Sequence, residues 1–160
     1  MPNDLGTIEN SRTPDQYRHM LATIGKGICP FCSLVLCKGE VLREGLFWRI
    51  WHNPFPYEHH AYHFVVAHKE HKTDILDLTA GEWAELGEFN QWAIRKFKLP
   101  GGGLVMRFGD PAFNAGTIRH LHAHIQNPDL RGPAKATFAK DICPRDIEQA
   151  IRESYDEMLG

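Results

Sequence analysis

The sequence predicts an α+β fold in which helices pack against an antiparallel sheet. Three observations support this class: short apolar segments that alternate as β-strands do, turn-length connections between several of them, and one long amphipathic helical segment between two strands. The chain has 160 residues, of which 42% are hydrophobic and 24% charged, which is typical of a folded globular protein. With no repeat or linker in it, this length predicts one domain over residues 1–160.

The first helix is expected after Thr13 and Pro14, because threonine is a favoured N-cap and proline fits the first helical turn. It should run to Ile24 and end at Gly25, since glycine readily adopts the left-handed conformation that ends helices. The residues expected on its buried side are Tyr17, Leu21 and Ile24.

A second, longer helix is expected at Thr79 and Glu82, which have the spacing of a capping box. The apolar residues that follow recur at helical spacing as far as about Lys98. Aromatic residues in such a stripe are more typical of a core than of a cofactor pocket. The predicted buried stripe consists of Trp83, Leu86, Phe89, Ala93 and Phe97.

Five strands account for most of the other apolar segments. They are expected over Leu46–Trp51, Tyr62–His68, Leu104–Phe108, Thr117–Ile125 and Ala134–Ala139. Alternation along the second strand places His63 and Val65 on one face and Phe64 on the other. An amphipathic helix after Pro144 completes the chain, so residues 133–160 should form a last strand and helix.

The charge balance and the N-terminal residues exclude several classes of protein. Lys and Arg number 18 against 20 Asp and Glu, a formal net charge of −2, which argues against binding nucleic acid through bulk positive charge. No apolar segment reaches the roughly 18 residues of a membrane helix, and the polar residues 1–13 do not have the pattern of a signal peptide. We therefore expect a cytoplasmic protein with neither a nucleic-acid nor a membrane partner.

The cysteines Cys29 and Cys32 form a C-x-x-C pair that has three interpretations. The pair can be half of a zinc site, a redox motif, or two buried small residues. A redox motif of the thioredoxin kind needs a strand before it and a long helix after it, whereas glycines and a proline make the approach here a loop. This favours zinc. Cys37 and Cys143 are interpreted as packing residues or unreactive thiols.

Three histidines alternate along one predicted strand, at His120, His122 and His124. Side chains on a strand alternate between its faces, so all three imidazoles should lie on one face, which core packing does not explain. They can be ligands of a catalytic zinc, or one of them can be a neutral nucleophile that attacks phosphorus. The loop before them supplies Asn114 and Thr117, whose amide and hydroxyl groups suit phosphate and favour the second interpretation.

These motifs resemble the histidine triad (HIT) family. The segment from His120 to Gln126 is similar to its motif H-φ-H-φ-H-φ-φ, where φ is usually apolar, and the segment from His63 to His71 is similar to its second signature. The C-x-x-C pair is similar to the zinc-bearing branch, so the resemblance covers residues 29–126. It implies a HIT-like antiparallel sheet of about five strands with one long central helix, in a homodimer that hydrolyses or transfers nucleotidyl groups.

The resemblance assigns a role to each matching residue. It makes His122 the nucleophile that forms a nucleotidyl-histidine intermediate, and it makes His124 a phosphate contact that assists the leaving group. Thr117 matches a residue that binds phosphate, His63 a histidine that lines the site, and Asn53 a residue that holds the ribose hydroxyls. Gly116 departs from the pattern, because the family commonly has a glutamine there.

The zinc-bearing branch implies a metal site made of Cys29, Cys32, His71 and His120. Two cysteines and two histidines form a closed tetrahedral set, so the zinc should be structural. His120 then belongs to the metal as well as to the triad. His59, His60 and His68 are expected to lie mostly at the surface or in loops and are given no role.

The expected ligands are a purine nucleotide or a dinucleoside polyphosphate, and nucleoside phosphoramidates are a further substrate class. Two hypotheses from other classes stay open. One is a zinc-dependent hydrolase in which His120, His122 and His124 surround a catalytic metal. The other is a non-catalytic nucleotide-binding module that keeps the pocket.

Overall fold

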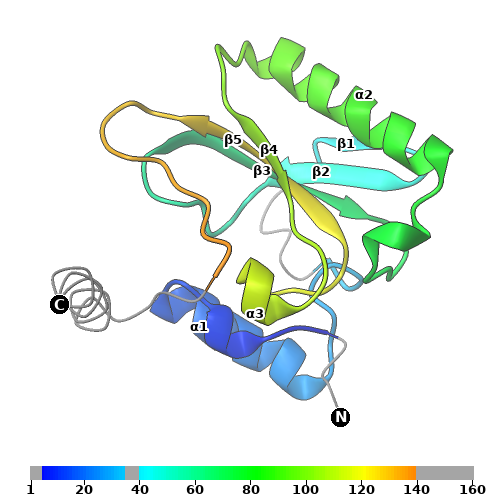
Figure 1. The fold of residues 1–160 in the computed structure, drawn as a ribbon, viewed down its shortest axis with the longest axis vertical. Helices are drawn as coiled ribbons and strands as arrows, with labels where there is room; N and C mark the ends of the chain where they lie inside the picture. Colours follow the sequence, from blue (N-terminus) through cyan, green and yellow to red (C-terminus); the bar gives the residue numbers. More distant parts are fainter. Residues whose placement is uncertain (1–4, 35–39, 140–160) are drawn as a thin grey trace, which may run out of the picture.

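The computed structural model describes residues 5–34 and 40–139 (Figure 1). Five strands form one antiparallel sheet in the order β1-β2-β3-β5-β4. The α+β class with an antiparallel sheet is therefore confirmed. The strands are β1 (Arg43–Glu44), β2 (Trp48–His52), β3 (His60–His68), β4 (Gly103–Met106) and β5 (His122–Pro128). The α-helices are α1 (Pro14–Ala22), α2 (Ala80–Phe97) and α3 (Pro111–Asn114), with 3-10 turns at Ile8–Asn10, Ile24–Lys26 and Ile75–Asp77.

The sheet has helices on both faces, with α2 on one side and α1 on the other (Figure 1). Alternation along β3 divides the core as predicted. Phe64 packs in the cluster under α2, and Val65 packs in the second cluster, beside the C-x-x-C loop and α1. The first cluster contains Trp48, Ile50, Phe64, Val66, Leu86, Phe89, Ala93, Ala123 and Ile125. The second contains Met20, Ile24, Cys29, Phe31, Trp51, Val65 and Ala67.

The capping box of α2 is confirmed, since the Thr79 hydroxyl accepts from the Glu82 N–H and the Thr79 N–H donates to the Glu82 carboxylate at 2.6 Å. The predicted buried stripe is right from Leu86 to Ala93 and wrong at Trp83, which is 43% exposed. The helix is rotated so that Glu82 faces the sheet in its place. There its carboxylate accepts from the His68 ring, a contact that outweighs the apolar pattern.

The predicted buried side of α1 is wrong at two positions, since Tyr17 and Leu21 are 44% and 45% exposed. Gln16 and Met20 are buried there, next to Ile24. The Gln16 side chain accepts the backbone N–H of Arg12, which holds this face of the helix toward the molecule. The helix itself ends at Ala22.

Two of the predicted strands differ from the structure. Residues 134–139 form no strand, because the Thr137 carbonyl accepts from the Arg107 guanidinium and not from a neighbouring strand; the fifth strand is β1. The last strand begins at His122 instead of Thr117, since residues 117–119 pair with the N-terminal segment through Thr7 N–H to Thr117 O at 2.8 Å. Gly6 allows this close approach, because a Cβ there would lie 2.1 Å from the Thr117 carbonyl.

The predicted C-terminal helix, Cys37 and Cys143 lie outside the described residues. Within the described residues, every helix is too short or too polar to cross a membrane.

Candidate active site and metal centre

The pairing of β3 with β5 presents the triad on the face that α1 covers. Val65 pairs with His124 and Ala67 with His122, so both histidines share the side of the second core cluster. Ala123 lies in the cluster under α2, on the opposite face. The predicted alternation is therefore present, although His120 precedes the first residue of β5.

One ring nitrogen of His122 is hydrogen-bonded to the backbone, and the other is available to react. Its Nδ1 lies 2.7 Å from the His120 carbonyl, which can only accept, so Nδ1 carries the proton. The Nε2 lone pair is then the available one. Burial lowers the pKa of His122 to about 4, so the ring is neutral at pH 7.

His124 is oriented by a relay that begins at the backbone. The Tyr57 N–H donates to His63 Nδ1 at 3.1 Å, so the proton of neutral His63 is on Nε2, 2.8 Å from His124 Nδ1. His124 therefore accepts at Nδ1 and carries its own proton on Nε2, ready to donate. Burial lowers the pKa of His63 to about 3 and that of His124 well below its usual value, which keeps both rings neutral.

A cavity of about 40 Å³ adjoins His122 and His124. Thr117 lines it with a hydroxyl that is buried and has no hydrogen-bond partner among the described residues. Buried polar atoms are usually paired, so this hydroxyl is suited to a ligand. Two guanidinium groups, from Arg12 and Arg107, also line the cavity, and none of its described lining residues is an Asp or Glu. The cavity therefore suits an anion.

Two other predicted residues occupy different positions. Asn53 lines the same cavity, with its Oδ1 accepting from the Phe55 N–H and its Nδ2 3.2 Å from the His63 ring. The Asn114 side chain is used within its own loop, where it donates to the Phe108 carbonyl and accepts from the Gly116 N–H. Asn114 thus shapes the loop before the triad.

The metal ligands Cys29, Cys32, His71 and His120 lie together, with one ligand atom from each within 4.8 Å of the others. His120 Nδ1 lies 3.4 Å from each sulfur, and His71 Nδ1 lies 3.3 Å from Cys32. A tetrahedral zinc with Zn–S of about 2.3 Å and Zn–N of about 2.1 Å separates sulfur from nitrogen by about 3.6 Å. The four residues therefore fit a zinc ion, as predicted.

Solved histidine triad proteins share this arrangement of elements. A histidine triad nucleotide-binding protein from Candida albicans superposes with a TM-score of 0.53 and 16% identity, over 81% of this chain and 95% of that one. A HIT family hydrolase from Clostridium thermocellum has a TM-score of 0.51 and 17% identity, over 65% and 93%. A HIT-like protein has a TM-score of 0.51 and 20% identity, over 62% and 97%. This chain has the histidine triad fold.

Comparison by sequence adds no further likeness: no family model matches the chain, and no curated protein matches it. The histidine triad fold is thus kept at low sequence identity.

A buried polar cluster supports the zinc-ligand end of the site, which we call the metal end. It contains His68, which was expected at the surface or in a loop but is 2% exposed. His120 Nε2 donates to the His68 carbonyl at 2.6 Å, which turns Nδ1 toward the cysteines. The His68 ring donates to Glu82 at 2.9 Å, and Lys72 reaches the same carboxylate oxygen at 2.5 Å. The hydrogen bonds from Lys72 and from the Thr79 N–H lower the pKa of Glu82 to about 2. The cluster fixes residues 68–72, which carry the ligand His71.

Sequence reasoning also missed Arg12, Arg107 and Phe31. The Phe31 ring packs edge-on against His122 with ring centroids 4.9 Å apart, and its place between the two cysteines was the available signal. The signal for Arg107 was weaker: it is a charged residue near the end of a predicted strand. Nothing local marked Arg12, which reaches the site because the N-terminal segment folds back onto residues 117–119.

Proposed function

We propose that the protein cleaves nucleotide phosphates, as a hydrolase or a nucleotidyl transferase, through a covalent intermediate on His122. The observation that carries the proposal is the free Nε2 of a neutral His122, beside a second histidine whose relay leaves it a donor. A neutral imidazole is a nucleophile at pH 7 without a separate base.

The reaction has two steps. In the first, the His122 Nε2 lone pair forms a bond to the α-phosphorus, and the bond from phosphorus to the departing group breaks with its electron pair. The His124 Nε2–H donates to the departing atom. In the second, water or another acceptor attacks the phosphorus, its proton returns to His124, and the bond to His122 breaks.

The remaining residues stabilise the phosphate and the nucleoside. The Thr117 hydroxyl, which has no partner among the described residues, donates to a phosphoryl oxygen as charge develops there. We assign the ribose hydroxyls to Asn53 and the purine base to the aromatic walls, Phe31 and Trp51, since bases stack on aromatic rings. His63 acts by holding His124.

The zinc is structural in this proposal. Its four protein ligands fill a tetrahedral set, which joins the C-x-x-C loop to the residue before β5. The rival with three histidines on one catalytic metal is disfavoured, because the rings turn to three partners: the cysteines for His120, a carbonyl for His122 and His63 for His124. Rapid, reversible loss of activity on chelation without unfolding would favour that rival.

The deciding experiment is to trap the adduct. The protein is incubated with a dinucleoside polyphosphate or a nucleoside phosphoramidate, quenched in alkali, and analysed by mass spectrometry for a nucleotidyl group on His122. We expect the adduct in the wild type and not in His122→Asn. Nucleotide binding with no adduct and no turnover would support the non-catalytic binding module instead.

We also propose a cytoplasmic homodimer. Zinc needs reduced thiolates, which a reducing compartment maintains. β4 pairs only with β5 in the described sheet and leaves an open edge, with Leu104 half exposed on it. Light scattering should give about twice the chain mass, and Val105→Pro on this edge should give a monomer.

A further inference from the structure

We propose that Arg12, with Arg107, is a specificity-determining residue that binds negative charge on the departing group. This inference rests on the proposed function and deepens it. It assigns to this chain a preference for departing groups that are phosphates over departing groups that are amines. The residues that carry it lie outside the histidine motif, at the N-terminal segment and at the end of β4.

Tyr57 contacts both guanidinium groups and lies beside His63 and His124, on the side of the site where His124 donates to the departing group. The Arg12 guanidinium lies 4.2 Å from the centre of the Tyr57 ring, and Arg107 Nη1 lies 3.3 Å from the Tyr57 hydroxyl. The same ring is 4.4 Å from His63 and 5.8 Å from His124, between centroids. The positive charge therefore lies beside the relay that serves the departing group, whereas Phe31 packs against His122.

Arg107 is part of the scaffold and keeps donors to spare. It is 9% exposed, and it donates to the carbonyls of Asn114 and Thr137 at 2.6 and 2.8 Å. These contacts and Tyr57 use three of the five N–H groups of a guanidinium. Arginine is suited to phosphate because its guanidinium stays charged and planar, and here its remaining N–H groups can donate to phosphate oxygens.

Arg12 is held at the cavity by its own segment. Its backbone N–H donates to Gln16 at 2.8 Å at the start of α1. Two residues earlier, Asn10 donates to the Gly116 carbonyl at 3.0 Å, which ties the segment to the loop before the triad. The segment thus places a cation at a site that the motif residues alone leave neutral.

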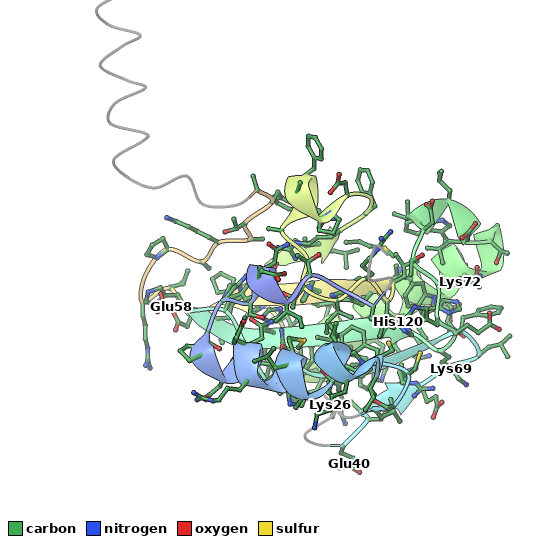
Figure 2. All side chains as sticks on the ribbon, turned by 90° about the horizontal axis from the view of Figure 1, so that it is seen from below. Lys26, Glu40, Glu58, Lys69, Lys72 and His120 are labelled. Atoms are coloured by element: carbon green, nitrogen blue, oxygen red, sulfur yellow. The ribbon has the colours of Figure 1, made fainter. Side chains whose placement is uncertain are left out.

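The space for a departing group lies beyond Arg12 and Tyr57. A groove of about 350 Å³ shares Arg12, Gln16, Phe55 and Tyr57 with the small cavity. Glu58, which is among its lining residues, lies at one end of the molecule, away from His120 (Figure 2). Besides Tyr57, the charged or titratable residues that line the groove are Arg12, Glu58, His59 and Lys135. Two permanent cations against one carboxylate suit a phosphate chain.

The test compares two substrates with the same nucleotidyl group. One is a dinucleoside tetraphosphate, whose departing group is a nucleoside triphosphate; the other is a nucleoside phosphoramidate, whose departing group is an amine. Arg12→Gln should lower kcat/KM for the tetraphosphate by about tenfold or more, and for the phosphoramidate by less than about twofold. Arg12→Lys should restore part of the difference, since it keeps the charge.

Arg18→Gln is the matched control, because Arg18 lies on α1, has a side chain 70% exposed and pairs with Asp15 away from the cavity. It removes the same charge and should change neither rate by more than about twofold. An equal loss on both substrates in Arg12→Gln would overturn the inference, because Arg12 would then serve the phosphate that His122 attacks, or the fold.

A binding measurement separates this inference from the chemistry. Inorganic tripolyphosphate is titrated into the wild type, Arg12→Gln and Arg18→Gln by calorimetry. Tighter binding of tripolyphosphate than of orthophosphate, lost in Arg12→Gln alone, would support the anion site even if no adduct ever forms on His122. Equal affinity of the wild type for the two anions would overturn it, while adduct formation would still support the proposed function.

Discussion

The metal end and the reactive end of the site each carry a histidine of the triad, and these two histidines have different roles. His120 and His122 are two residues apart, and both are neutral because burial lowers the pKa of each to about 4. His120 gives its Nε2–H to the His68 carbonyl and turns Nδ1 to the cysteines. His122 gives its Nδ1–H to the His120 carbonyl and keeps Nε2 free.

The difference teaches that the partner of one ring nitrogen decides the role of the other. At the metal end, two sulfurs and a second histidine surround the free nitrogen, which suits it to be a zinc ligand. At the reactive end, the surroundings are Thr117, His124 and two guanidinium groups, with none of the described lining residues an acid. The two ends should therefore respond independently to substitution.

The largest expected effect is at the reactive end. His122→Ala should lower turnover by about 10⁴-fold or more, because it removes the proposed nucleophile. The zinc content, measured by elemental analysis, and the thermal midpoint should stay close to the wild type, since His122 is not a metal ligand. Turnover within tenfold of the wild type would exclude the covalent mechanism.

The converse effect is expected at the metal end. Cys29→Ser should lose zinc and, with it, the stability that a bound ligand supplies, about 4 kcal/mol when zinc is present at 1,000 times its Kd. Elemental analysis and urea unfolding measure the two losses. Because Cys29 is buried, Cys32→Ser is the control at an exposed ligand. If both variants keep zinc, the ligand set is wrong.

Much of both ends could be predicted from sequence, because their signals are local. Alternation along one strand placed His122 and His124 on one face, and the capping box marked the start of α2. Long-range contacts decided what failed. Glu82 turns toward His68, 14 residues away, and this displaces Trp83 from the predicted stripe.

The same reason explains the residues that sequence reasoning missed. Arg12 comes to the cavity only because Thr7 and Asn10 bond to residues more than 100 positions later. Residues 134–139 look like a strand, but Thr137 is held by the Arg107 side chain. Neither contact has a periodicity or a motif that a single sequence displays.

The relay at the reactive end should matter less than the nucleophile. His63→Phe keeps a ring at this position but removes the N–H that donates to His124. We expect kcat to fall by about 10²-fold, the usual size of a lost proton-transfer contribution, with zinc content unchanged. If kcat instead stays at the wild-type value, His124 does not depend on the relay.

The reactive end should also make the fold sensitive to acid. The pKa of His63 is about 3 in the folded protein and near 6.5 when unfolded. As the pH falls below 6.5, the unfolded chain takes up a proton that the folded protein refuses, so stability decreases until about pH 3. The protonation of His63 changes the free energy of unfolding by at most about 1.4 kcal/mol per pH unit. Urea unfolding between pH 6.5 and 4.5 should show that the free energy of unfolding falls less steeply with pH in His63→Phe than in the wild type. Acid also releases zinc, but it does so in both proteins, so the difference between them reports on His63.

The smallest effect should come from the cluster that supports the metal end. Glu82→Gln keeps the shape of the side chain but removes the charge that His68 and Lys72 share, so the free energy of unfolding should fall by about 1–2 kcal/mol. Zinc affinity should fall by about tenfold, because residues 68–72 carry His71 and the His68 carbonyl orients His120. Competition with a chromophoric chelator measures this affinity.

Glu85→Gln is the control: Glu85 also bonds from α2 to the sheet, but to the backbone at Leu46, Phe47 and Trp48. The free energy of unfolding should fall in both variants, whereas zinc affinity should fall only in Glu82→Gln. Once zinc is saturating, the adduct on His122 should form at the wild-type rate. Equal zinc affinity in the two variants would mean that the cluster does not support the metal site.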